Sequence, residues 1–280
     1  MRVRVWGSRG TIASPGADTV RYGGNTSCLE VHLDDGTRLV LDAGTGARTL
    51  GHALLADPPP RLDLLLTHLH IDHVEGLTAF EPIWRTETEL HVWGPASPIS
   101  SLDRRVAAYF SPPLFPVHLT EVPASVAFHD APEGTWTIGG ATVRSAAIQH
   151  QGATVGYRIE ADGAVLAYLT DHEPGLGTDL ASTDPDWISG AALAWGADLL
   201  IHDCQYTEEE YASRVGFGHT STADVAAFAR TVGARRLVLF HHDPMHSDAE
   251  LEAMRERVVE LWDGDPSLVE IAAEGAELAA

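Results

Sequence analysis

Residues 62–73 have the sequence Leu-Asp-Leu-Leu-Leu-Thr-His-Leu-His-Ile-Asp-His, an apolar run that continues directly into an HxHxDH motif. In extended backbone, alternate side chains point the same way, so His68, His70 and Asp72 are predicted to converge on one face. His73 breaks this alternation and needs a turn, which directs its imidazole to a neighbouring point. The stretch therefore predicts two adjacent cation sites, with His68 and His70 on one and Asp72 and His73 on the other.

Two side chains leave each cation under-coordinated, so further ligands are expected from other parts of the chain. His150, Asp171 and His241 each stand where a predicted strand opens into a loop. Taken singly, a histidine at a strand end is more often structural than metal-bound. Their common placement at strand ends favours a shared role as ligands.

Short β-rich runs alternate with helix-like segments along the whole chain, which predicts strands covered by helices. The expected strands are 2–6, 28–33, 38–42, 62–67, 89–93, 117–122, 135–138, 141–147, 154–160, 164–169, 198–202 and 236–241. The expected helices are 44–56, 74–80, 100–109, 187–195, 221–232 and 248–262. Neither a linker nor a repeat divides the chain. We therefore expect one domain, 1–280, built from two packed β-sheets with helices outside.

The charge composition excludes several classes of function. The 280 residues include 40 acidic and 18 basic side chains, and every basic one is arginine. Without lysine there is no Schiff-base catalysis, no lysine general base and no lysine-containing P-loop. The formal charge of −22 repels polyanions, so long DNA or RNA is an unfavourable partner.

Nothing in the sequence predicts a membrane or secretory segment. The longest apolar runs are far shorter than the ~20 residues that span a bilayer. The alternating start, Met1–Trp6, lacks the apolar core of a secretory signal. We therefore expect a cytoplasmic protein with no membrane contact. Cys28 and Cys204 form no CxxC pattern, and we expect both to be buried thiols.

The HxHxDH motif after an apolar strand, followed by a later His, Asp and His at strand ends, resembles the metallo-β-lactamase superfamily of binuclear metallohydrolases. Within it, the chain is most similar to the phosphodiesterase branch that includes tRNase Z and cyclic-phosphate phosphodiesterases. Further stretches agree, namely Trp6–Gly10, Tyr22–Ser27, Leu41–Gly46, Gly218–Thr222 and Leu239–Pro244. The resemblance implies an α/β fold, the four-layer αββα sandwich of this superfamily.

The resemblance also implies which residues hold metal. One ion would be bound by His68, His70 and His150. A second would be bound by Asp72, His73 and His241, and Asp171 would bridge both ions. Imidazole with carboxylate suits Zn²⁺, which we expect, and it also accepts Mn²⁺, Fe²⁺ or Co²⁺.

Three residues have proposed catalytic roles by the same resemblance. Asp72 would orient the metal-bridging hydroxide, and His219, paired with Asp203, would donate a proton to the leaving group. The branch has glutamate where Asp203 stands, and His219 has a second interpretation as a helix-capping loop residue. Asp42 resembles an aspartate that orients ligands from behind, and a turn-capping role is the equal alternative.

These features together predict a metal-dependent phosphodiesterase for a small phosphodiester of the cyclic nucleotide or cyclic ribose phosphate type. The alternatives are a hydrolase of lactones, β-lactams or thioesters, a tRNA 3′-processing endonuclease, and a catalytically idle metal-bound binding protein. A homodimer is a further expectation from the resemblance. The sequence assigns no role to four residues next to proposed ligands, His172, His242, Asp243 and His246.

Overall fold

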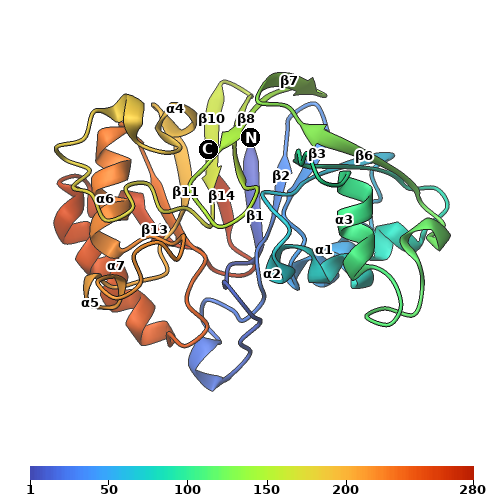
Figure 1. Ribbon diagram of the computed structural model, residues 1–280, viewed down its shortest axis with the longest axis horizontal. Coiled ribbons are helices and arrows are strands. Elements are labelled where there is room, and N and C mark those ends of the chain that lie inside the picture. The colour runs from blue at the N-terminus through green and yellow to red at the C-terminus, as the bar shows by residue number, and fades with distance from the viewer.

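Two seven-stranded β-sheets pack face to face in the computed structural model, which describes residues 1–280, and helices cover both outer sides (Figure 1). The first sheet has the order β14-β1-β2-β3-β4-β5-β6, and the second has the order β13-β12-β11-β10-β9-β8-β7. The first half of the chain thus builds the first sheet, apart from β14. This arrangement is the αββα sandwich expected from the sequence.

The strands have the following bounds. Those of the first sheet are β1 (Arg2–Gly7), β2 (Cys28–His32), β3 (Arg38–Leu41), β4 (Arg61–Leu65), β5 (Glu89–Pro95), β6 (Ser125–Ala131) and β14 (Glu277–Ala279). Those of the second are β7 (Gly134–Ile138), β8 (Ala141–Ala147), β9 (Val155–Ala161), β10 (Ala164–Leu169), β11 (Leu199–Asp203), β12 (Leu237–Phe240) and β13 (Val269–Ile271).

Helices connect the strands and cover the sheets. The α-helices are α1 (Gly46–Leu54), α2 (Ile71–Val74), α3 (Leu102–Tyr109), α4 (Ala191–Ala194), α5 (Glu208–Tyr211), α6 (Thr222–Thr231) and α7 (Asp248–Trp262). The 3-10 helices are η1 (Ala17–Thr19), η2 (Glu75–Ala79), η3 (Glu81–Trp84), η4 (Leu119–Glu121), η5 (Pro185–Trp187) and η6 (Pro266–Leu268). None of these helices is long and apolar enough to cross a bilayer.

Three apolar clusters follow from the alternation of side chains in the strands. One cluster lies between the sheets and joins, for example, Val31 of β2 to Ile159 of β9. A second lies under α6 and α7, and a third lies under α1 and α3. Both sheets therefore share a central core, while the assignment of 1–280 to one domain stays a prediction.

The fold brings the carboxyl ends of many strands to one edge of the sandwich. Strands β3 to β6 run parallel to one another, as do β10 to β13. Strand β8 has the same direction as β10, because each is antiparallel to β9. In sheets of this kind the loops after the carboxyl ends carry the functional side chains.

The structure corrects three predicted elements. The predicted strand 117–122 is wrong, because 119–121 form η4 and the strand of this region is β6. Glu121 accepts a hydrogen bond from the backbone nitrogen of His118 at 2.8 Å, which caps a helical turn. The predicted helix 187–195 is interrupted by Gly190, which has a φ of +72°, and the predicted helix 74–80 is divided between α2 and η2.

Candidate metal centre

The seven predicted metal ligands lie together at the edge where the strands end. The loop after β4 carries the HxHxDH motif, and the other three residues follow β8, β10 and β12. Five of the seven line a cavity of about 580 Å³, and the other two, His68 and His73, are buried beside it. The motif turns as predicted, because His70 has extended backbone and α2, which contains His73, begins at Ile71.

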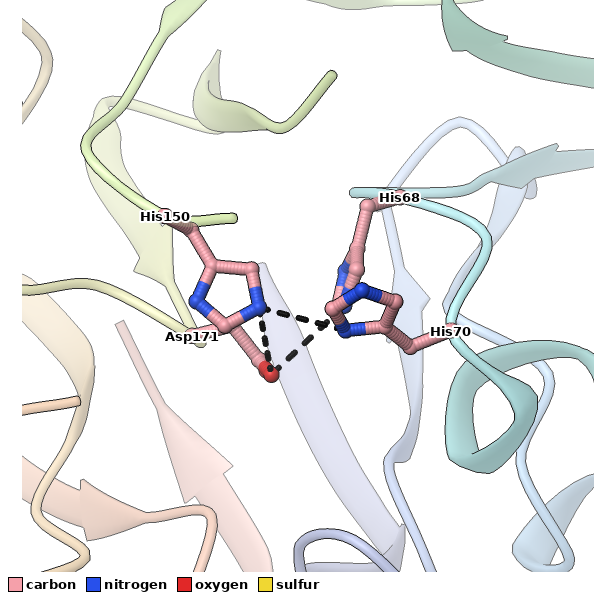
Figure 2. A group of neighbouring side chains, drawn as sticks. All are labelled: His68, His70, His150 and Asp171. Atoms are coloured by element: carbon pink, nitrogen blue, oxygen red, sulfur yellow. Dashed lines mark hydrogen bonds and ion pairs between the residues drawn. The ribbon is translucent and has the colours of Figure 1, made fainter. Parts of the chain in front are cut away.

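The first group contains His68, His70, His150 and Asp171, whose nearest ligand atoms all lie within 4.8 Å of one another. Figure 2 shows two side chains from each sheet facing one another. Asp171 Oδ1 is 3.6 Å from His68 Nε2 and 3.6 Å from His150 Nε2. His150 Nε2 is 3.2 Å from His70 Nδ1. These four atoms enclose a point that a single cation fits.

The second group contains Asp72, His73, His241 and again Asp171. Asp171 presents its other oxygen here, because Oδ2 is 3.0 Å from His73 Nε2 and 3.1 Å from His241 Nε2. Asp72 Oδ2 lies 3.4 Å and 3.3 Å from the same two nitrogens. Asp171 therefore gives one carboxylate oxygen to each group, as a bridging ligand would.

Asp42 orients two of the histidines from behind. It is fully buried, and its Oδ2 accepts hydrogen bonds from His73 Nδ1 and from the Tyr168 hydroxyl, both at 2.9 Å. Its Oδ1 accepts from the Thr67 backbone nitrogen at 2.7 Å. The Thr67 hydroxyl also donates to Asp42 and accepts from His68 Nδ1 at 3.1 Å. Of the two interpretations of Asp42, this geometry favours the ligand-orienting one.

Two further histidines are oriented in the same way. His150 Nδ1 donates to the Gly218 carbonyl at 2.8 Å, and His241 Nδ1 donates to Gln205 Oε1 at 3.2 Å. Each Nδ1 therefore carries the proton, and each Nε2 presents its lone pair to the cavity. Fixing the tautomer in this way prepares an imidazole for a metal.

A metal ion fits this donor set. Within the cluster, two buried ring nitrogens, His68 Nε2 and His73 Nε2, have no hydrogen-bond partner. Buried polar atoms without partners are rare in folded proteins and call for an explanation. Imidazole nitrogens and carboxylate oxygens that converge on two adjacent points are a donor set suited to divalent transition metals.

The electrostatics of the cluster are consistent with this assignment. Burial by itself raises the pKa of the Asp171 carboxyl, but the surrounding histidines, His241 first, hold it well below its usual value. Burial lowers the pKa of His68 well below its usual value, which keeps this imidazole neutral. Burial also acts to lower the pKa of His241, yet Asp171 and the other carboxylates raise it to about 10. These carboxylates favour positive charge at this point, and a bound cation would supply that charge in place of the proton on Nε2.

Asp203 and His219 form the predicted pair on the second sheet's side of the cavity. His219 Nδ1 donates to Asp203 Oδ2 at 2.8 Å, so the shorter aspartate reaches the histidine. Asp203 is fully buried and also accepts from the backbone nitrogen of Thr220 at 2.8 Å. Burial acts to raise the pKa of Asp203, but His219 and the nearby His241 lower it below its usual value. His219 lines the cavity and stacks on His241 with ring centroids 5.0 Å apart.

The four residues without an assigned role do not line the cavity. His172 Nδ1 contacts His202 Nε2 at 2.9 Å, and both rings are buried against the second sheet's helices. His242 Nε2 contacts the Ala272 carbonyl at 3.1 Å. His246 is paired with a glutamate, and Asp243 offers its carbonyl to Arg9. These contacts are structural.

Sequence reasoning missed several residues of the cavity wall: Thr11, Ile71, Gln151, Gln205, Tyr206 and Phe217. The most consequential is Thr11, whose backbone nitrogen donates to Asp72 Oδ2 at 2.6 Å. Buried Arg9 anchors this loop, because its guanidinium donates to the carbonyls of Gly23 and His246 at 2.9 and 2.7 Å. The Trp6–Gly10 motif indicated that this loop is important, but its spacing does not reveal that the loop contacts Asp72.

Comparison with known proteins agrees with the fold. Residues 37–242 match the Beta-lactamase superfamily domain. Ribonuclease Z of Haloarcula marismortui is 24% identical over 315 aligned positions, which cover 96% of this chain and 94% of that protein. The crystal structure of the metallo-beta-lactamase fold protein YhfI from Bacillus subtilis has a TM-score of 0.70 at 19% identity, over 99% of both chains.

A crystal structure described as a new diphosphatase from the PhnP family has a TM-score of 0.68 at 16% identity, over 100% of this chain and 97% of the other. At these identities the two solved structures establish the shared fold alone. The domain match, in contrast, covers more than half of the chain. The chain therefore belongs to the beta-lactamase superfamily and has the metallo-β-lactamase fold.

Proposed function

We propose that the chain is an enzyme, a metal-dependent phosphodiesterase that hydrolyses a small phosphodiester. The observation that carries this proposal is Asp171, whose two oxygens face two separate histidine groups. One carboxylate shared in this way supports a binuclear site for two divalent cations, with zinc as the expected metal. When bound, such a pair supplies a hydroxide at neutral pH and neutralises the phosphoryl oxygens in the transition state.

The chain's own residues have separate roles in this reaction. Asp72, a member of the second group, holds Oδ2 close to His73 and His241 and would orient the nucleophile for attack on phosphorus. The new P–O bond forms as the bond to the leaving oxygen breaks. Because an alkoxide is a strong base, the departing oxygen needs a proton. His219 would donate it from Nε2, while Asp203 holds Nδ1 and stabilises positive charge on the ring.

Charge and size favour a small substrate. No arginine lines the cavity, and the chain as a whole carries a formal charge of −22. A polyanion such as tRNA would therefore be repelled outside the metal site, whereas one phosphodiester carries a single negative charge. The similarity to Ribonuclease Z supports chemistry at phosphorus, with tRNA 3′-processing as the alternative. A cytoplasmic location and a homodimer are parts of the same proposal.

Metal analysis followed by a substrate panel tests the function. The purified protein is assayed with bis-p-nitrophenyl phosphate, 2′,3′- and 3′,5′-cyclic nucleotides, precursor tRNA, nitrocefin, lactones and thioesters. We expect kcat/KM to be highest for the small diesters. A preference for lactones, β-lactams or thioesters would overturn the proposal. Metal-loaded protein that turns over none of these compounds would instead indicate a binding protein.

A further inference from the structure

The rim of the cavity carries a large apolar side chain that packs into no core. Phe217 is 54% exposed, lines the cavity, and lies two residues before His219. Ile71, which is 49% exposed, lines the same cavity from the loop after β4. Phe217 and Ile71 differ from other exposed apolar residues in that both line the cavity, where a bound ligand would cover them, and burial of apolar surface is favourable.

The backbone on both sides of Phe217 is held in place. Buried Glu173 accepts hydrogen bonds from the nitrogens of Gly216 and Gly218, both at 2.8 Å. Its Oε1 also accepts from the Tyr211 hydroxyl at 2.8 Å. The Gly218 carbonyl in turn accepts from His150 Nδ1. The backbone that carries Phe217 is therefore held relative to the proposed ligands, and a ligand that contacts this side chain does not have to order a mobile loop.

The rim offers flat apolar surface and amide groups but no free positive charge. Gln151 Nε2 donates to the Gly216 carbonyl at 3.2 Å, which places this amide beside Phe217. Arg214, the arginine of the same loop, lies over the Tyr206 ring at 4.8 Å and pairs with Glu210 at 3.5 Å. A second phosphate would find no partner here. An uncharged, flat group with polar edges could stack on the Phe217 ring and form hydrogen bonds with the nearby amide of Gln151.

We infer that Phe217 forms a stacking surface for a nucleobase of the substrate, so that the substrate is a nucleoside phosphodiester. This inference rests on the proposed function and adds the substrate class. Stacking of a base on an aromatic side chain contributes about 1–3 kcal/mol per base, which corresponds to about 5- to 150-fold in affinity. The contact tolerates different bases, because each base has a flat face.

The test compares two phosphodiesters that share one leaving group. Thymidine 5′-p-nitrophenyl phosphate and methyl p-nitrophenyl phosphate both release p-nitrophenolate, so they differ only in the group that would reach Phe217. We expect wild-type protein to favour the thymidine ester in kcat/KM by about tenfold or more. Phe217→Ala should bring this ratio near one. Phe217→Tyr should keep the ratio, and Phe217→Leu, apolar but not aromatic, should lower it.

Trp187→Ala is the matched control. Trp187 is an 84% exposed aromatic residue that does not line the cavity, so its removal should leave the ratio unchanged. Calorimetric titration with thymidine 5′-monophosphate and with methyl phosphate gives a second measurement, which does not depend on turnover. Phe217→Ala should weaken the binding of thymidine 5′-monophosphate and leave the binding of methyl phosphate unchanged.

The possible outcomes distinguish a failure of this inference from a failure of the proposed phosphodiesterase function. If wild type and Phe217→Ala hydrolyse both esters with equal kcat/KM and bind thymidine 5′-monophosphate equally tightly, the stacking surface is wrong and the phosphodiesterase stands. A Phe217→Leu protein with the wild-type ratio would overturn stacking in favour of a plain apolar contact. If metal-loaded protein hydrolyses neither ester, the proposed function itself fails.

Discussion

Asp42→Asn isolates the orientation of one proposed ligand. The fully buried carboxylate gives Oδ1 to the Thr67 backbone nitrogen at 2.7 Å and Oδ2 to His73 Nδ1 and the Tyr168 hydroxyl at 2.9 Å. The Thr67 hydroxyl is a fourth donor to this carboxylate, and an amide has one oxygen and one NH₂ group for all four. The backbone N–H of Thr67 cannot become an acceptor, so the amide oxygen must stay there, and the NH₂ group then faces His73 and Tyr168.

The tyrosine hydroxyl can rotate and accept, but His73 must move its proton from Nδ1 to Nε2. Nε2 is the nitrogen that faces Asp171 at 3.0 Å, and with a proton it offers no lone pair to a cation. Loss of such an orienting partner typically costs 10- to 100-fold in metal affinity, or about 1.4–2.7 kcal/mol. We therefore expect Asp42→Asn to weaken the second metal site by this factor and the first site much less.

Competition between the protein and a chromogenic chelator, fitted to two sites, measures both affinities, and circular dichroism checks the fold. Asp63→Asn is the matched control, because Asp63 is also buried in the first sheet but is bound by Arg61 and Trp93 outside the cluster. A folded Asp42→Asn protein with two unchanged affinities would refute the reasoning. Equal weakening in the Asp63→Asn protein would show that the effect is general and not transmitted by His73.

Three other predictions concern different parts of the structure. His219→Ala should slow the hydrolysis of phosphodiesters with an alkoxide leaving group by about 100-fold or more. Hydrolysis of p-nitrophenyl esters, whose leaving group needs no proton, should slow far less, and equal losses in kcat for the two kinds of ester would exclude His219 as the proton donor. Asp171→Ala should lose both metals on dialysis while His241→Ala loses one, as elemental analysis would show, and two ions retained in Asp171→Ala would exclude a bridge. Burial lowers the pKa of His202 to about 4 in the folded protein. Between about pH 6.5 and pH 4 this histidine is therefore protonated in the unfolded chain but neutral in the folded protein, so the stability of the fold decreases as the pH drops through that range. His202→Asn should reduce the decrease in the free energy of unfolding between pH 7 and pH 4 by up to about 3 kcal/mol, as urea unfolding at the two pH values would show. The same decrease in His202→Asn and in wild type would contradict a contribution from His202.

Much of the cluster was predictable because its residues lie at strand ends in short, regular spacings. HxHxDH carries four of the seven proposed ligands, and the strand-to-turn geometry at His73 follows from its spacing alone. The bridging position of Asp171 came from family resemblance, since nothing in its own sequence surroundings distinguishes a bridging from a terminal carboxylate. The structure brings these residues together, and their role as metal ligands stays a prediction.

The rest of the site depends on contacts between segments far apart in the chain. Thr11 reaches Asp72 only because buried Arg9 joins its loop to residues more than 200 positions away. Gln205 becomes a partner of His241 because β11 and β12 are neighbours in the sheet, which no local pattern reveals. Similarly, β6 was missed because the prolines around η4 moved the strand beyond the segment with the strongest apolar alternation.

Glu173 has a consequence for how this site can change. It fixes the nitrogens of Gly216 and Gly218 through backbone contacts, which do not depend on the side chain between them. Substitutions at Phe217 can therefore alter what the rim accepts while His150 and His219 keep their positions. Under the proposed function, substrate preference and catalytic geometry would therefore be encoded at separate residues, an arrangement that lets a sequence acquire new specificities through single mutations without first losing activity.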